Sequence, residues 1–361
     1  MTGTAVIAEP PQSAAIRRWV ATVLDDFLRC KTRAAMDLRM PAEVAWTLRD
    51  FLAAGGKRLR PLLCVIGWQA AGGHGTPAFV VKAAASLEMF HAFALIHDDV
   101  MDNSDSRRGA PTVHRRLARH QDVSRNAPSA ERLGTSSAIL IGDLALAWSD
   151  ELLHNAGLTS SQLAAVLPLL HVMRTEVMYG QYLDVTAAGR PTCDVDRAWQ
   201  IVRYKTAKYT IERPLHIGAA LAGAPPAMHE TLSAYALPLG EAFQLRDDIL
   251  GVFGDPSTTG KPCLDDLRDG KNTVLIALAL QRATPGQRST LQTLLGNPEL
   301  DGAGADRIRQ VLISSGARDE LERMINGRRA QAVRALDAAP YPLAATAALR
   351  QLAHTATART S

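Results

Sequence analysis

Residues 95–108 read LIHDDVMDNSDSRR, and this stretch governs the interpretation of the rest of the chain. Asp98 and Asp102 are four residues apart, so on a helix they lie one turn above the other, with Asp99 beside them. Residues 83–97 are mostly apolar and contain neither glycine nor proline, which predicts a buried helix. We therefore expect three carboxylates on one helical face, where a buried helix opens into a cavity.

Carboxylates clustered near a protein interior repel one another and lose hydration unless a cation compensates their charge. Oxygen ligands suit a hard divalent ion such as magnesium. On this motif alone an acidic helix end in solvent stays an open alternative, because carboxylates are rarely buried without a partner.

A second stretch, residues 243–271, reads FQLRDDILGVFGDPSTTGKPCLDDLRDGK. It predicts another apolar helix, which ends in the paired aspartates Asp247 and Asp248 and then breaks in a Gly/Pro loop. Two acidic helix ends that face each other across a cavity would hold divalent ions, and a ligand with several negative oxygens would bridge them. A diphosphate is the ligand that this arrangement favours.

The motif GGKRLRP at residues 55–61 predicts an anion site at the start of a helix. The two glycines allow a tight turn. Lys57, Arg58 and Arg60 then place cations near a helix N-terminus, where backbone amides already favour anions. An ordinary helix start with surface bases is the alternative interpretation.

Further polar side chains occupy positions from which they would reach the same ligand. His91 precedes Asp98 by two helical turns on nearly the same side, and with Glu88 it interrupts an apolar surface. Lys205 and Thr206, in the motif YKTAK, offer an ammonium and a hydroxyl to a phosphate. The remaining candidates are Arg107 and Arg108, which follow the first aspartates, and Asp184 in GQYLD.

The composition predicts an all-α protein. Hydrophobic residues make up 47% of the 361 residues and aromatic residues only 5%, and Ala/Leu-rich segments dominate over runs of β-branched residues. No linker divides the chain, so we expect a loose tail over residues 1–14 and a single domain over residues 15–361. The net charge of +4 comes from scattered basic residues, which does not favour a nucleic-acid partner.

Glycine and proline divide the chain into expected helices at residues 15–35, 41–53, 58–70, 77–102, 134–157 and 159–184, with a flexible connection at 120–135. We expect the C-terminal third to consist of helices that pack against the rest of the domain. The sequence shows no signal-peptide pattern and no apolar run of membrane-spanning length. Cys30, Cys64, Cys193 and Cys263 lack paired spacing, which predicts a protein of the reducing cytoplasm.

Taken together, the motifs GGKRLRP, HDDVMD, GQYLD, YKTAK and FQLRDDILGVFGD with GKP resemble those of the trans-prenyl diphosphate synthases in type, order and spacing. The resemblance covers about residues 50–280. It implies an all-α isoprenoid-synthase fold, a helical bundle around a deep central cavity, usually in a homodimer. It also implies that isopentenyl diphosphate is joined to an allylic diphosphate through a carbocation, with three magnesium ions at the site.

The resemblance assigns roles to individual residues. The family's metal ligands fall on Asp98, Asp102 and Asp247, supported by Asp99 and Asp248, and Lys205 completes the implied catalytic set. Isopentenyl diphosphate would be held by Lys57, Arg60, His91 and Arg108. The allylic diphosphate would be held by Arg107, Lys205, Thr206, Gln244, Lys261 and Lys271.

The sequence departs from the family pattern at two positions. Gly251 stands where the family often has a third aspartate, and Leu264 stands where a glycine is usual. We expect activity to survive with weaker metal affinity, because Asp247 and Asp248 remain. A weakly active or non-catalytic partner subunit stays an alternative. A terpene cyclase is disfavoured, because such enzymes have an Asn/Ser/Glu second motif and lack GGKRLRP.

Residues one to two turns before Asp98 should form the floor of the pocket for the growing chain. An aromatic residue five positions before the first aspartate, here Phe93, with the small Ala94 after it, resembles the pattern of C20 geranylgeranyl synthases. Phe90 would instead shorten the pocket to the C15 farnesyl product. Packing in the core is the alternative role of both phenylalanines.

Overall fold

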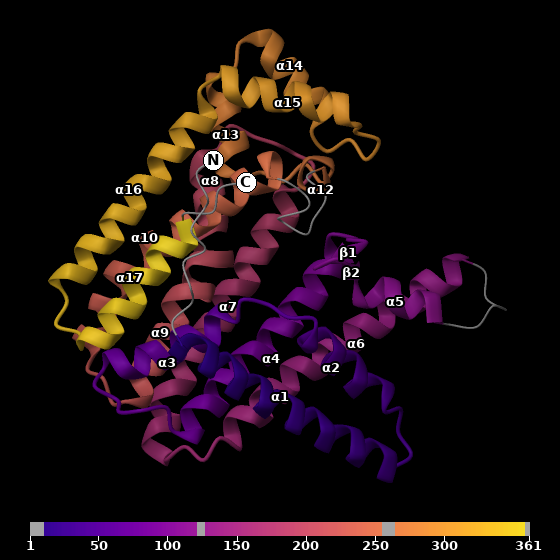
Figure 1. Cartoon of the computed structure of the whole chain (residues 1–361). Helices are drawn as coiled ribbons and strands as arrows, with labels where there is room; N and C mark the ends of the chain where they lie inside the picture. The colour runs from indigo at the N-terminus through magenta and orange to yellow at the C-terminus, as the bar shows by residue number, and fades with distance from the viewer. Residues whose placement is uncertain (1–10, 121–126, 255–263, 358–361) are drawn as a thin grey trace, which may run out of the picture.

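The structure is a computed structural model that describes residues 11–120, 127–254 and 264–357 (Figure 1). Nearly all of this part of the chain is helical, so the predicted fold class is confirmed. The first helices are α1 (Pro11–Asp37), α2 (Glu43–Ala53), α3 (Leu59–Ala70), α4 (Ala78–Met101), α5 (Val113–His120), α6 (Ala127–His154) and α7 (Ser160–Ala187). After them come α8 (Val195–Ile201), the π-helix η1 (Val202–Glu212), α9 (Arg213–Leu221), α10 (Pro226–Phe253), α12 (Asp265–Arg268), α13 (Val274–Arg282), α14 (Pro285–Leu294), α15 (Gly302–Ser314), α16 (Ala317–Ala338) and α17 (Leu343–Thr357). The strands of the described ranges are β1 (Ser106–Arg107) and β2 (Ala110–Pro111), an antiparallel pair.

Helix α4 is the central helix of the molecule. Between Val80 and Ile96, side chains on nearly all sides of this helix are buried. A surface helix would instead bury the side chains of one face. By length and composition it is the one described helix that would be able to cross a membrane, but 67% of the relevant window is buried inside the protein. The burial of α4 is that of a core helix, and the predicted buried helix before Asp98 is confirmed.

Two groups of buried side chains form the core. The larger surrounds α4 and includes Leu63 of α3 and Leu215 of α9, whereas the smaller includes Ile308 of α15. Helix α10 contributes Leu239 to the first group and Leu245 to the second, so it ties the two together. Helices α14 and α15 lie at one end of the molecule and α1 and α2 at the opposite end (Figure 1).

Helix α7 and the π-helix η1 approach each other closely at Gly180. A Cβ atom on Gly180 would lie 2.4 Å from the backbone nitrogen of Lys205, so no larger residue fits there. One turn away, Glu176 of α7 accepts hydrogen bonds from Arg213 Nε and Nη2, both at 2.8 Å, and from Lys208. These contacts hold the segment that carries Lys205 against α7.

Two sequence predictions about helix boundaries are wrong. Helix α1 begins at Pro11, so the tail predicted over residues 1–14 is too long. Helix α6 begins at Ala127, inside the flexible connection predicted over residues 120–135. The polar residues of its first turns, such as Glu131, are exposed, so their polarity marks the solvent face of a helix and not a loop.

Candidate active site

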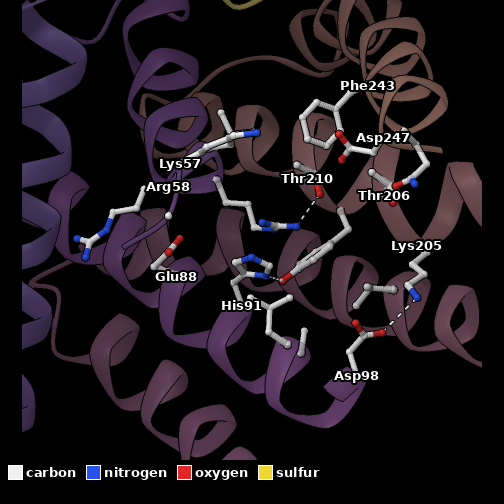
Figure 2. Close-up of a pocket in the computed structure, with 18 of the residues that line it drawn as sticks. Lys57, Arg58, Glu88, His91, Asp98, Lys205, Thr206, Thr210, Phe243 and Asp247 are labelled. Carbon is white, nitrogen blue, oxygen red and sulfur yellow. Dashed lines mark hydrogen bonds and ion pairs between the residues drawn. The ribbon is translucent and has the colours of Figure 1, made fainter. Parts of the chain in front are cut away.

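A cavity of about 820 Å³ opens between α3, α4, η1 and α10 (Figure 2). Its wall brings together predicted residues from separate motifs, namely Lys57, Arg60, His91, Asp98, Arg107, Arg108, Lys205, Thr206, Gln244 and Asp247. Asp99, Asp102, Asp248 and Lys271 are not part of this wall, and Lys261 lies outside the described residues. The wall also includes residues that the sequence analysis did not assign to the ligands, among them Arg17, Gln181, Tyr209 and Thr210.

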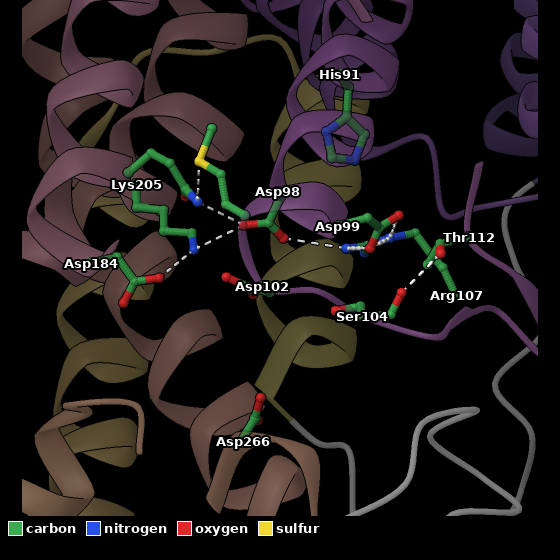
Figure 3. A network of polar contacts seen from close by, with 12 residues as sticks. His91, Asp98, Asp99, Asp102, Ser104, Arg107, Thr112, Asp184, Lys205 and Asp266 are labelled. Carbon is green, nitrogen blue, oxygen red and sulfur yellow. Dashed lines mark hydrogen bonds and ion pairs between the residues drawn. The ribbon is translucent and has the colours of Figure 1, made fainter. Parts of the chain in front are cut away.

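Asp98 has polar contacts with three side chains at the cavity (Figure 3). Its Oδ1 accepts from Lys205 Nζ at 3.2 Å and from Gln181 Nε2 at 3.0 Å, and its Oδ2 accepts from Arg107 Nη2 at 3.2 Å. Burial opposes ionisation of Asp98, but the charges of Lys205 and Arg107 outweigh it and lower the pKa of this carboxyl. Asp98 is therefore a carboxylate at every physiological pH.

Asp99 does not share the face of Asp98, contrary to the prediction. Its side chain is 1% exposed, and both of its carboxylate oxygens accept from Arg107 Nε at 2.8 Å. Successive residues of an α-helix point about 100° apart, so Asp99 turns away from the cavity and toward β1, which carries Arg107. Asp99 thus holds Arg107 in place at the cavity wall.

Two partly buried lysines each bridge a pair of aspartates. Lys205 binds Asp184 in addition to Asp98 (Figure 3). Lys271 lies 3.1 Å from Asp102 and 3.2 Å from Asp266. Burial disfavours a charged ammonium, but the surrounding carboxylates outweigh this effect and raise the pKa of both lysines. The acidic groups beside the cavity are therefore compensated by cations of the protein itself.

On α10, the two paired aspartates have different environments. Asp247 lines the cavity, whereas Asp248 is buried and accepts from Gln244 Nε2 at 2.8 Å. Gln244 in turn accepts from Thr206 Oγ1 at 2.6 Å. Burial, with the nearby charges of Asp266 and Asp247, raises the pKa of Asp248 to about 7. Asp248 therefore orients Gln244 and Thr206 at the wall, and Asp247 is the member of the pair that lines the cavity.

At the other end of the cavity, η1 supplies two side chains that the sequence analysis missed. Arg60 Nη2 donates to Thr210 Oγ1 at 2.6 Å, and its guanidinium lies 4.1 Å from the centre of the Tyr209 ring. The Tyr209 hydroxyl lies 3.2 Å from His91 Nδ1. Tyr209 and Thr210 directly follow YKTAK, and extending that motif by one helical turn would have found them.

The glycines of GGKRLRP have positive φ angles of 92° at Gly55 and 146° at Gly56, as the predicted tight turn requires. Arg108 crosses this turn and donates to the carbonyl oxygen of Gly55. A Cβ atom on Gly56 would lie 2.7 Å from Arg108 Nη2. Gly56 therefore makes room for Arg108 beside Lys57.

The place that a third aspartate would take on α10 is already filled. A Cβ atom on Gly251 would lie 2.2 Å from Asp266 Oδ2, so Asp266 of α12 presents its carboxylate where a side chain at position 251 would begin. Leu264 is the first described residue after the gap and directly precedes α12.

Of the residues predicted to set product length, Ala94 lines the cavity. Phe90 and Phe93 are buried beside it, with ring centres 5.3 Å apart. The Phe90 ring also lies 5.8 Å from the Tyr209 ring, and the Phe93 ring lies 4.7 Å from the His97 ring. Their role in product length stays a prediction.

Comparison with known proteins decides the family. Residues 42–312 match a family model described as Polyprenyl synthetase. The chain belongs to the polyprenyl synthetase family. This synthetase is a transferase of the short-chain prenyl diphosphate synthases, as its motifs predicted.

Three similar proteins show the range of named products. The synthetase is 35% identical to the geranylfarnesyl diphosphate synthase of Aeropyrum pernix, over 78% of this chain and 83% of that protein. It is 32% identical to the (2E,6E)-farnesyl diphosphate synthase of Mycobacterium bovis, over 71% of this chain and 66% of that protein. A crystal structure of geranylgeranyl pyrophosphate synthase from Corynebacterium glutamicum, complexed with isoprenyl diphosphate and magnesium, superposes with a TM-score of 0.91. It has 40% identity and covers 96% of this chain and 99% of that one.

Proposed function

We propose that this synthetase joins isopentenyl diphosphate to an allylic diphosphate, head to tail and in trans, and releases geranylgeranyl diphosphate. The observation that supports it most strongly is the separation of charge along one cavity (Figure 2). Lys57 and Arg58 lie on one side, and Asp98, Asp247 and Lys205 lie on the other. Arg60, from the same motif as Lys57, also lines the cavity. A cationic wall binds a diphosphate directly, whereas an acidic wall binds one through cations, so the cavity offers two different diphosphate sites.

The acidic side has the donor set that magnesium prefers. Within the described ranges, no three acidic or histidine side chains converge closely enough to hold an ion alone. Ions at Asp98, Asp102 and Asp247 would therefore take further oxygens from a diphosphate, and we propose three of them. When bound, magnesium supplies positive charge that stabilises the departing diphosphate.

On the same side, the protein's own cations and hydrogen-bond donors would hold the allylic diphosphate. Arg107 and Lys205 already contact Asp98, so their charges lie where negative charge develops as the carbon–oxygen bond breaks. We assign Thr206, Gln244, Lys271 and Lys261 to the same diphosphate. Ala94, Leu95 and Val177 add an apolar part of the wall, which suits an isoprenoid chain and excludes water from the cation.

The first experiment is turnover by the purified protein. Isopentenyl diphosphate is supplied with dimethylallyl, geranyl or farnesyl diphosphate, with and without magnesium, and the products are separated by chromatography. We expect magnesium-dependent elongation that stops at the C20 product. A stop at C15 would make the protein a farnesyl diphosphate synthase, and no elongation with any primer would leave the partner-subunit interpretation.

Product length should respond to residues one turn before Asp98. Ala94→Phe places a ring in the cavity wall and should shorten the main product, whereas Phe93→Ala removes a buried ring beside it and should lengthen the product. Chromatography of the dephosphorylated products measures both changes. If both variants make the wild-type product, the residues that limit product length lie on another helix.

We also propose that the synthetase is a homodimer that pairs through α6 and α7. These helices expose Leu140 (63%), Tyr179 (67%) and Tyr182 (66%), large side chains without charge of the kind that oligomer interfaces bury. Leu140→Asp should therefore release monomers, as measured by sedimentation velocity. Leu343→Asp on α17, where the leucine is 89% exposed, is the matched control and should leave the dimer intact. A wild-type protein that sediments as a monomer would contradict the proposal.

The proposed location is the cytoplasm. Cys30, Cys64 and Cys193 are free thiols, which supports a reducing compartment, and Cys263 lies outside the described residues.

A further inference from the structure

Glu88 is a buried acidic residue on the cationic side of the cavity. It lies on α4 one turn before His91, is 4% exposed and forms part of the cavity wall. Its Oε2 is buried without a hydrogen-bond partner among the described residues. Figure 2 shows Glu88 on the side of Arg58, away from Asp98 and the acidic wall. An ionised carboxyl group at this position would repel the diphosphate that the cationic side chains are proposed to bind.

The groups that face Glu88 are cationic or neutral. Arg58 and Arg60 come from the start of α3, Arg108 comes from the segment that precedes β2, and Tyr209 comes from η1. The wall further includes Arg17 of α1, Lys57, and His91 of α4 itself. None of these cations makes an ion pair with Glu88 within the described ranges, although each has a flexible side chain.

Burial of Glu88 favours its neutral form over its ionised form. Burial raises the pKa of Glu88, and the charges of Arg60, Arg58 and Arg108 oppose this effect without overcoming it. An ionised carboxylate here would be buried without a hydrogen bond and would repel a diphosphate. A protonated carboxyl group has an O–H that donates a hydrogen bond, and the missing partner is then an acceptor.

We propose that Glu88 is a substrate-binding residue that, as a neutral carboxylic acid, donates a hydrogen bond to the diphosphate of the homoallylic substrate, between Arg60 and Arg108. This inference rests on the proposed function, because it assigns isopentenyl diphosphate to the cationic side of the cavity. The arginines supply charge, and Glu88 supplies a donor that adds no positive charge to a region already crowded with guanidinium groups.

The proposal has a definite pH dependence. The donating form of Glu88 predominates below its raised pKa and is lost as the pH rises through that pKa. Loss of the proton removes the donor and adds a negative charge beside the diphosphate. The KM for isopentenyl diphosphate should therefore increase with pH by more than ionisation of the substrate itself explains. The KM for the allylic substrate should show no such additional increase.

Two variants separate the donor role from other roles. Glu88→Gln keeps a neutral donor that cannot titrate, and Glu88→Met keeps the length of the side chain without a donor. We expect the Gln variant to keep the wild-type KM at low pH and to remove the Glu88-dependent rise at high pH. We expect the Met variant to increase this KM about tenfold at every pH. Thermal melting confirms that each variant is folded.

Three outcomes would overturn the proposal. If Gln impairs binding as strongly as Met, Glu88 acts as an anion that orients the arginines. If neither variant changes the KM, the residue has no role in binding. If both KM values change together, the effect is structural. Calorimetric measurement of the Kd for isopentenyl diphosphate tests the same pattern without turnover, so failure of the proposed function and failure of this inference are distinguishable.

Discussion

Asp98→Asn should lower kcat by about 10³-fold while leaving the fold intact, because it removes a negative charge from the acidic wall of the cavity. The carboxylate of Asp98 lies within hydrogen-bond distance of Lys205, Gln181 and Arg107. An amide of the same shape keeps the packing but cannot compensate these cations or serve as an anionic ligand. Steady-state kinetics at saturating magnesium measures the loss, and the required magnesium concentration should increase.

The matched control is Asp105→Asn. Asp105 lies seven residues after Asp98, is largely exposed and pairs with Arg115. It should keep wild-type kcat because a surface ion pair contributes little. If Asp98→Asn retained full activity, or if both variants lost the same activity, the acidic wall of the cavity would not be the place of reaction.

Lys205→Met should lower kcat by about 10²-fold or more, because it removes a partly buried positive charge directed at the developing negative charge. Lys205 binds Asp98 and Asp184 and lines the cavity. Lys205→Arg should recover only part of the rate, since a planar guanidinium does not reproduce the position of an ammonium between two carboxylates.

Lys82→Met is the control for this loss, because Lys82 is a surface lysine that donates to the backbone oxygen of Asn155. The Lys82→Met variant should keep the wild-type kcat. A Lys205→Met variant that changed only the KM for isopentenyl diphosphate would place Lys205 in the other diphosphate site and contradict the assignment.

The sequence predicted the parts of this molecule that depend on local spacing. A buried helix before Asp98 follows from an apolar run without glycine, and the turn beside Lys57 follows from two adjacent glycines. Two similar acidic helix ends suggested that Asp98 and Asp247 would meet across a cavity, and the resemblance to a known family turned this suggestion into an expectation, because no local pattern relates residues so far apart.

The predictions that went wrong or were missed concern the direction of side chains and the path of the backbone. Asp99 was predicted to share the face of Asp98, but its side chain is buried and does not line the cavity. The π-helical path of η1, on which Tyr209 lies beside Arg60, is not encoded in hydrophobic spacing. Tertiary contacts settled these points.

The contact between Gly251 and Asp266 links two positions that are distant in the sequence. A Cβ atom on residue 251 would lie 2.2 Å from Oδ2 of Asp266, so a larger residue at position 251 requires the Asp266 side chain to move. Because Asp266 also lies 3.2 Å from Lys271, that movement would change the surroundings of a lysine beside the cavity. A substitution at position 251 would thus act on the site through a neighbouring side chain as well as through its own.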